Sequence, residues 1–183
     1  MTVCPIAGAG RPSTWFLWHA HSIRPGSRVI DLACGQGRHS LAAAALGACV
    51  TGVDKDPAKL AVAQESAAGA RLSIDWLEVD LEGPWPELGS FDAVLVFNYL
   101  DRANMPRIID LVAPGGTLMM ETFLEAQREA GWGPTSERHL LRVGELARLV
   151  APLTILHGRE VYETVDPERW RAVASVVAGR SKK

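Results

Sequence analysis

The chain has 183 residues and a formal net charge of -2, with 48% hydrophobic and 22% charged residues. This length suits one compact domain of ordinary globular composition, and the near-neutral charge argues against a nucleic-acid partner. Three cysteines without a C-x-x-C spacing argue against a zinc cluster or a disulfide framework and favour a reducing compartment.

The first part of the chain shows no targeting pattern. No basic stretch precedes an apolar one in the Gly-, Pro- and Ala-rich residues 1–12, and no run of 18 apolar residues occurs anywhere. We therefore expect a soluble, cytoplasmic protein with no membrane partner, in which residues 1–12 form a loose lead-in.

A short helix is predicted next, with Ser13 as its N-cap and aromatic residues at Trp15, Phe16 and Trp18. These tryptophans either pack the helix over a sheet or line a substrate pocket. Pro and Gly within residues 24–28 end this helix.

From residue 28 onward, apolar runs of strand length alternate with longer amphipathic segments. The predicted strands are Arg28–Leu32, Cys49–Val53, Leu72–Val79, Phe91–Phe97 and Thr117–Phe123. The predicted helices are Arg38–Leu46, Asp56–Ala68 and Asn104–Val112, with a loop at 83–86 and a turn at the APGG of 113–116. This alternation predicts a mainly parallel sheet covered on both faces, with ligands at the carboxyl ends of the strands.

A glycine loop follows the first predicted strand, in the run Asp31-Leu-Ala-Cys-Gly-Gln-Gly37. Two glycines allow a tight turn with exposed N–H groups, and the helix starting near Arg38 points its positive end to the same place. Asp54 follows the second strand, about 20 residues downstream, where a carboxylate can accept hydrogen bonds from a ribose diol. Together these features indicate a nucleoside-containing cofactor.

Two classes of cofactor fit this geometry. A dinucleotide prefers G-x-G-x-x-G, but the run here is A-x-G-x-G-R-H-S and lacks the third glycine. S-adenosylmethionine (SAM) needs acidic groups for its amino-acid end, its ribose and its adenine, and Asp31, Asp54 and Asp80 lie at suitable places. A P-loop is excluded because no G-K-[ST] ends the glycine loop.

Five segments in order, VIDLACGQGRHS, VTGVDKD, WLEVDLEG, FDAVLVFNYL and LVAPGGTLMMETF, resemble the successive motifs of class I SAM-dependent methyltransferases. The resemblance covers about residues 12–165 and is closest to a small bacterial branch with tellurite-resistance and thiol methyltransferase-like proteins. One departure is Ala33, which replaces the first glycine of the usual G-x-G-x-G.

The resemblance implies an α/β fold, a Rossmann-like three-layer α/β/α sandwich formed by one domain over residues 1–183. Its seven-stranded sheet is mostly parallel with an antiparallel last strand. LTILHGREVYE and RWRAVASVVAGR would supply the final two strands as a hairpin, although Ala and Arg also suit a helix in the second.

The resemblance also implies a set of cofactor-binding residues, with no metal. They are Asp31, Ala33, Cys34, Gly35, Gly37, Arg38, Asp54, Lys55, Asp80, Leu81 and Asn98. Structural alternatives stand beside some of these roles: Asp54 can cap the turn before Pro57, and Asp80 can be ordinary loop. Cys34 is expected to pack as a small side chain, and not to act as a nucleophile.

Candidate catalytic and substrate-pocket residues follow the later strands. Asn98 and Tyr99 come after the fourth strand, where the family places its reacting centre, and Glu121 ends the fifth strand beside Thr122 and Phe123. Residues 124–142 are predicted to be a lid or insert, from which Trp132 and His139 would contact the substrate.

The resulting functional prediction is an enzyme that transfers a methyl group from SAM to a small-molecule acceptor, leaving S-adenosylhomocysteine (SAH). Tyr99, Glu121 and His139 are the candidate bases. Because none stands out, a soft acceptor such as a thiol or a chalcogen oxyanion is favoured. The alternatives are a non-catalytic SAM-binding sensor or subunit and an NAD-dependent oxidoreductase.

Overall fold

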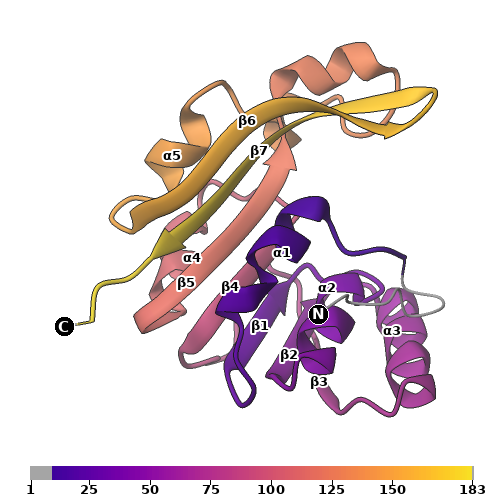
Figure 1. The fold of residues 1–183 in the computed structure, drawn as a ribbon, viewed down its shortest axis with the longest axis vertical. Helices are drawn as coiled ribbons and strands as arrows, with labels where there is room; N and C mark the ends of the chain where they lie inside the picture. Colours follow the sequence, from indigo (N-terminus) through magenta and orange to yellow (C-terminus); the bar gives the residue numbers. More distant parts are fainter. Residues whose placement is uncertain (1–9, 183) are drawn as a thin grey trace.

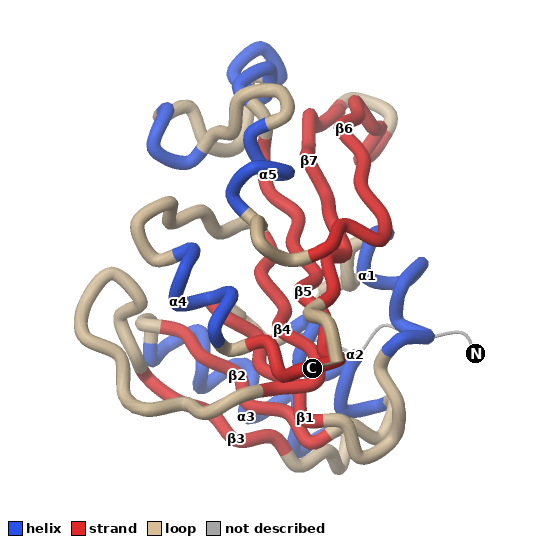
Figure 2. The backbone as a smooth tube through the Cα atoms, turned by 90° about the vertical axis from the view of Figure 1, so that its left-hand side faces the viewer, coloured by secondary structure: helices blue, strands red, loops and turns tan. Residues whose placement is uncertain are grey.

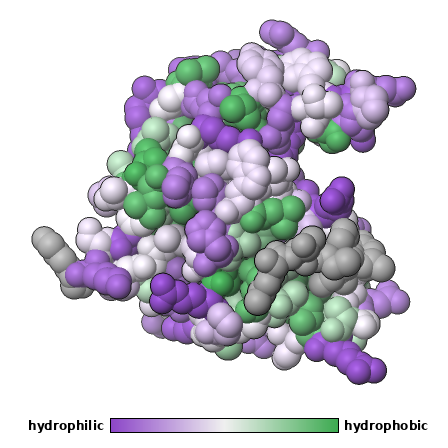
Figure 3. All heavy atoms as spheres, in the orientation of Figure 1, coloured by the Kyte–Doolittle hydropathy of each residue, from purple (hydrophilic) through white to green (hydrophobic). Residues whose placement is uncertain are grey.

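The computed structural model describes residues 10–182, so most of the predicted lead-in lies outside the described residues. Figure 1 shows one central sheet flanked by helices, with a long C-terminal hairpin at one end. The face drawn in Figure 3 is mostly hydrophilic, with apolar patches interspersed. Within residues 10–182, no helix has both the length and the apolar character needed to cross a membrane.

The sheet has seven strands in the order β3-β2-β1-β4-β5-β7-β6. Their bounds are β1 Arg28–Leu32, β2 Cys49–Asp54, β3 Ile74–Glu78, β4 Phe91–Phe97, β5 Val112–Phe123, β6 Thr154–Asp166 and β7 Arg169–Gly179. The pairs among the first five strands are parallel, whereas β7 is antiparallel to both β5 and β6. The predicted Rossmann-like sheet with its antiparallel last strand is confirmed.

Helices cover both faces of the sheet. They are α1 Thr14–His19, α2 Arg38–Ala45, α3 Pro57–Gly69, α4 Met105–Asp110 and α5 Glu145–Leu149, with 3₁₀ turns η1 Ala20–Ser22, η2 Glu125–Ala130 and η3 Glu137–His139. Figure 2 shows α4 and α5 on one side of the strands and α1 on the other. Each side has its own apolar core, one built around α4 and α5 and one around α1 and α2.

Two predicted helix starts are confirmed by their capping bonds. The Ser13 hydroxyl accepts from the Phe16 N–H at 3.1 Å, and the Asp56 carboxylate accepts from the N–H groups of Ala58 and Lys59. Pro57 occupies the first turn of α3, where its missing N–H costs nothing. These bonds fix where α1 and α3 leave the loops that precede them.

The predicted elements differ from the structure in the region of α4 and β5. The helix ends at Asp110 and β5 begins at Val112, so the APGG segment belongs to the strand. Gly116 allows this, because a Cβ there would lie 2.9 Å from the Phe91 carbonyl oxygen of the adjoining strand. Gly115 adopts φ +79°, a left-handed conformation that is common in turns, although the segment as a whole pairs as a strand.

The C-terminal segment is strand β7 and not a helix. It lies between β5 and β6 and pairs with both, so its backbone hydrogen bonds are satisfied on two sides. Residues from Ala172 to Ala178 are buried. Pairing and burial on both faces therefore override the helix propensity of Ala and Arg.

Candidate active site

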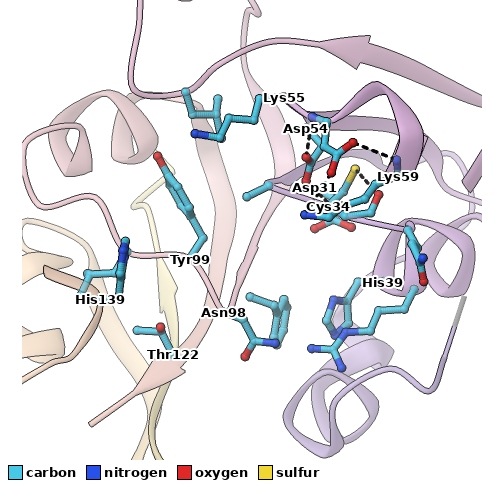
Figure 4. A pocket seen from close by; sticks show the side chains of 18 of the residues that line it. Asp31, Cys34, His39, Asp54, Lys55, Lys59, Asn98, Tyr99, Thr122 and His139 are labelled. Carbon is cyan, nitrogen blue, oxygen red and sulfur yellow. Dashed lines mark hydrogen bonds and ion pairs between the residues drawn. The ribbon is translucent and has the colours of Figure 1, made fainter. Parts of the chain in front are cut away.

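A pocket of about 790 Å³ lies at the carboxyl ends of the parallel strands (Figure 4). This volume is in the range of small-molecule sites. Its lining comes from five strand ends and the 124–142 segment: Asp31, Ala33, Cys34, Gly35, Gln36, Arg38, His39, Asp54, Lys55, Asp56, Lys59, Val79, Asp80, Leu81, Glu82, Phe97, Asn98, Tyr99, Leu100, Thr122, Phe123, Pro134 and His139. Most of the predicted site residues therefore lie together at the carboxyl ends of the strands, as expected for a parallel sheet.

The glycine loop after β1 uses its two glycines for different purposes. Gly35 has φ +58°, and a Cβ built there would meet nothing within 4 Å, so its backbone borders open pocket space. Gly37 has φ +77°, does not line the pocket, and would place a Cβ 2.6 Å from the Trp76 ring. Ala33 also has a positive φ, of 54°. The loop therefore presents Gly35 to a ligand, whereas Gly37 allows Trp76 to pack.

Gly35→Ala and Gly37→Ala are expected to separate binding from stability. Gly37→Ala should lower the free energy of unfolding by about 1 to 3 kcal/mol, since Trp76 must move. Gly35→Ala should cost about 1 kcal/mol of backbone strain but weaken ligand binding more, because the new methyl group enters the pocket. Urea unfolding and calorimetric titration check the two effects. If one of the two variants lost more of both the free energy of unfolding and the ligand affinity than the other, this assignment would be contradicted.

Asp54, at the end of β2, accepts a hydrogen bond from the backbone of the glycine loop. Its Oδ2 accepts from the Gly35 N–H at 2.7 Å, and its Oδ1 accepts from the Asp56 N–H at 3.0 Å. The side chain is 7% exposed and borders the pocket. The turn-capping role considered for Asp54 is thus present, and the same carboxylate still reaches the pocket.

Asp31 is a buried acid at the end of β1. Its carboxylate accepts from the Ser40 hydroxyl at 2.6 Å, and the residue is 1% exposed. Burial raises the pKa of Asp31 to about 7, against the opposing effect of the Ser40 hydrogen bond. Burial also raises the pKa of the Cys34 thiol, which keeps Cys34 protonated and supports a packing role for it.

The rim near β3 carries opposite charges. Lys55 Nζ lies 3.8 Å from Asp80 Oδ1 and 3.9 Å from Glu82 Oε1. Asp80 Oδ1 also accepts from the Glu82 N–H at 3.0 Å, and Leu81 between them is buried against the pocket. Asp80 is therefore both a turn residue and a pocket residue, and its carboxylate remains half exposed.

The opposite side of the pocket holds Asn98, Tyr99, Thr122 and His139, which face the Asp31–Asp54 side across the cavity (Figure 4). Asn98 has φ +57°, and its N–H donates to the Glu121 carbonyl at 2.8 Å. Burial raises the pKa of Tyr99, and neighbouring Asp101 raises it further. Tyr99 is therefore protonated at neutral pH.

Glu121 does not line the pocket, contrary to the expectation that it faces the substrate. Its fully buried carboxylate accepts from Arg159 and Arg171, both at 3.1 Å, and from the Ser175 hydroxyl at 2.8 Å. Glu121 lies opposite Ser175 of β7, which in turn lies opposite Arg159 of β6, so its side chain meets these polar residues, whereas Thr122 points to the other face of the sheet and reaches the pocket. Because its carboxylate oxygens accept from two arginines and a serine, Glu121 has a structural role.

The candidate tryptophans also lie outside the pocket lining. Trp15 is buried and donates from Nε1 to the Val176 carbonyl at 3.2 Å, which supports the packing alternative. Trp18 is 57% exposed and contacts Arg159. Trp132 donates from Nε1 to the Trp170 carbonyl at 2.8 Å and does not line the pocket. The residues of the 124–142 segment that line the pocket are Pro134 and His139.

Several lining residues were not predicted. Asp56, Lys59, Glu82 and Phe97 lie within a few residues of strand ends, so the rule that found Asp54 and Asp80 could have found them. His39 also lines the pocket. Its Nε2 accepts from the Ser13 N–H at 3.1 Å and its ring stacks on Phe97, while burial lowers its pKa.

Within residues 10–182, no group of His, Cys, Asp and Glu side chains could hold a metal ion. The cavity, the open space at Gly35 and the inward-facing carboxylate of Asp54 instead suit a nucleoside with a cationic tail. The donor set therefore fits the cofactor expected from the sequence.

Known proteins share this architecture. Residues 29–116 match a family model described as a methyltransferase domain. A ubiquinone biosynthesis O-methyltransferase from Methylocella silvestris is 32% identical in an alignment of 167 positions that covers 80% of this chain and 65% of that protein. Across the first curated relatives, the chain spans 44 to 65% of their length.

Two solved structures share the fold. TehB from Haemophilus influenzae superposes with a TM-score of 0.77 at 21% identity, over 93% of this chain and 63% of that one. A SAM-dependent methyltransferase from Methanosarcina mazei gives a TM-score of 0.74 at 17% identity, over 95% and 100% of the two chains. Residues 29–116 therefore form a methyltransferase domain, and the order of the motifs and of the strands is that of the class I SAM-dependent methyltransferase fold.

Proposed function

We propose that this protein transfers the methyl group of SAM to a small-molecule acceptor in the cytoplasm. The observation that carries the proposal is the single pocket into which the Gly35 backbone, the Asp54 carboxylate and the Asn98–Tyr99 loop converge. The bound cofactor supplies a methyl group already activated by a sulfonium, so the chain has to align the acceptor and exclude water.

Each end of the cofactor has a candidate partner in this pocket. Asp54 would accept from the ribose hydroxyls, and Asp80, beside buried Leu81, would accept from the adenine amine. Asp31 and the Gly35 loop would hold the amino-acid end, near Arg38. Of the remaining predicted contacts, Ala33, Cys34, Lys55 and Asn98 line the pocket, whereas Gly37 does not.

The lining also bears on the alternative of a non-catalytic SAM-binding protein. Such a protein would have its substrate mouth blocked by its own aromatic residues. Here the bulky Trp15, Trp18 and Trp132 lie outside the lining, and a cavity remains between Asn98 and His139. An open acceptor end supports catalysis.

The acceptor class depends on whether a base is used. With Tyr99 protonated and Glu121 engaged by arginines, His139 is the candidate base among the described pocket residues on this side. A thiol or reduced chalcogen needs no base, which keeps the predicted soft acceptor as the first candidate. An oxygen acceptor is the second, supported by the O-methyltransferase relative and by His139.

Turnover of labelled SAM against thiols, chalcogen oxyanions, phenols and amines tests the function, in the wild type and in His139→Ala. A soft acceptor should keep most of its turnover in the variant, whereas a phenol should lose about 100-fold or more, the usual contribution of a general base. SAH binding without turnover of any acceptor class would overturn the proposed transfer and favour a sensor.

Asp31 predicts that cofactor affinity depends on pH. Its pKa of about 7 means that ionised Asp31, the form that pairs with the α-ammonium of SAH, rises about tenfold in population between pH 6 and pH 8. SAH affinity should rise by about that factor in calorimetric titrations, and Asp31→Asn should remove the dependence. Equal wild-type affinity at both pH values would contradict the role of Asp31.

The raised pKa of Asp31 has the opposite effect on the stability of the ligand-free protein, which should fall as the pH rises. The pKa of Asp31 is higher in the folded than in the unfolded chain, so this group stabilises the fold most below pH about 4. That stability is lost as the pH rises to about 7, and Asp31→Asn should flatten this part of the stability curve.

A further inference from the structure

The pocket residue His139 has little local structure to hold it. It lies in η3, a 3₁₀ turn of three residues, and is exposed on its outer side. Its backbone N–H donates to the Ser136 carbonyl at 2.9 Å, whereas its imidazole makes no hydrogen bond with another described residue. The position of this ring therefore depends on how the backbone around it is fixed.

One guanidinium binds the backbone on both sides of His139. Arg102 Nη1 donates to the Arg138 carbonyl at 3.1 Å, and Arg102 Nη2 donates to the Leu140 carbonyl at 2.7 Å. The residues that supply these carbonyls are the immediate neighbours of His139. Arg102 thus brackets the pocket residue without touching its side chain.

Glu145 holds this guanidinium in place. Its Oε1 accepts from Arg102 Nε at 2.6 Å and its Oε2 accepts from Nη2 at 3.0 Å, while Oε2 also accepts from the Arg142 N–H at 2.8 Å. The hydrogen bond from Arg102 lowers the pKa of Glu145, and the same bond raises the pKa of Arg102. The pair therefore stays ionised across the neutral range.

Only an arginine has the donors for this arrangement. Its planar fork offers five N–H groups in fixed directions, whereas a lysine offers a compact ammonium that cannot reach a carboxylate and two separated carbonyls in the same way. Arg102 also follows Asn98 and Tyr99 in the loop after β4, a loop held by Asp101, which accepts from the N–H groups of Ala103 and Asn104. One side chain thus connects the loop after β4 with the 124–142 segment at the acceptor end of the pocket.

We propose that Arg102 is a positioning residue, which sets His139 at the acceptor end of the pocket by bracketing its backbone. This inference rests on the proposed function for its catalytic consequence, but its structural part can be tested alone. It assigns to the Arg102–Glu145 pair a role in how the acceptor is held, separate from cofactor binding.

The test compares Arg102→Lys with Arg148→Lys. Arg148 is an exposed arginine that lines a surface groove together with Arg102, so this change is a matched control. Histidines labelled at ¹³Cε1 are followed by NMR, with the His139 signal assigned from His139→Ala. Arg102→Lys should shift or broaden that signal and leave SAH affinity within about twofold, and Arg148→Lys should do neither. An unmoved His139 signal, or a loss of SAH affinity in parallel, would overturn the inference.

Acceptor kinetics provide the second measurement. With an acceptor found in the panel, Arg102→Lys should raise its KM about tenfold, and this effect should disappear in the His139→Ala background. An effect of equal size in both backgrounds would overturn the inference. If no acceptor turns over, the proposed function fails, and the His139 signal still decides on Arg102.

Should Arg102→Lys fail to fold, Glu145→Gln replaces it, since it keeps the contacts of Arg102 with both carbonyls but removes the ion pair. A shift or broadening of the His139 signal relative to the wild type supports the inference, and an unchanged signal overturns it.

Discussion

Replacing Asp54 by asparagine is expected to weaken SAH binding about 100-fold or more, as measured by calorimetric titration. The carboxylate lines the pocket and already accepts from Gly35 and Asp56, so its outward lone pairs are those proposed to take the ribose hydroxyls. Hydrogen bonds to a charged group contribute about 1.5 to 3 kcal/mol each. Losing the charge affects two such bonds at once, whereas the asparagine keeps the size of the side chain.

Asp92→Asn is the matched control for this prediction. Asp92 likewise accepts a backbone N–H, from Arg28 at 2.8 Å, but it lies near the start of β4, beside the start of β1 and away from the pocket. Its replacement should leave SAH affinity unchanged. Affinity of Asp54→Asn within threefold of the wild type would remove the main support for the proposed cofactor site.

Glu121→Ala is expected to be the most destabilising single change, lowering the free energy of unfolding by about 3 to 5 kcal/mol. That range is typical when one partner of a buried ion pair is removed and the other is left uncompensated. Here Arg159 and Arg171, whose side chains are only 15% and 12% exposed, would lose their fully buried partner and keep only the partly exposed Glu163. Urea unfolding of the variant checks this value.

Glu163→Ala is the comparison, because Glu163 also contacts Arg159 and Arg171 but is 21% exposed. It should cost less, since water can replace part of what is lost. The folded fraction of Glu121→Ala should bind SAH normally. A loss of less than 1 kcal/mol, or a selective loss of turnover in a stable Glu121→Gln protein, would contradict the structural role given to Glu121.

The sequence predicted the sheet well because its strands are short apolar runs separated by capped helices. Ser13 and Asp56 are caps whose effect is local, so they can be identified without tertiary information. The fate of the APGG segment could not be predicted, because Gly116 is needed for its contact with the Phe91 carbonyl of a neighbouring strand. The strand assignment of β7 likewise depends on two partners that only the fold supplies.

Some residues of the candidate site could likewise be predicted from the sequence, and others could not. Asp54 and Asp80 follow from the rule that parallel strands end at one edge, and both line the pocket. The face on which Glu121 lies depends on the register of β5, and one residue decides between Thr122 and Glu121. Arg102 gives no local signal, because its partners lie 36 to 43 residues away in the sequence.

The neutral imidazole of His39 links the first helix to the floor of the pocket through the Ser13 N–H. Phe16 of that helix covers Phe97, and Trp15 belongs to the same apolar core as Met119 and Val177. Deleting the residues that precede β1 would therefore expose a large apolar surface. We expect such shortened versions to precipitate, so labels and fusion partners are better joined ahead of residue 10 than in place of this helix.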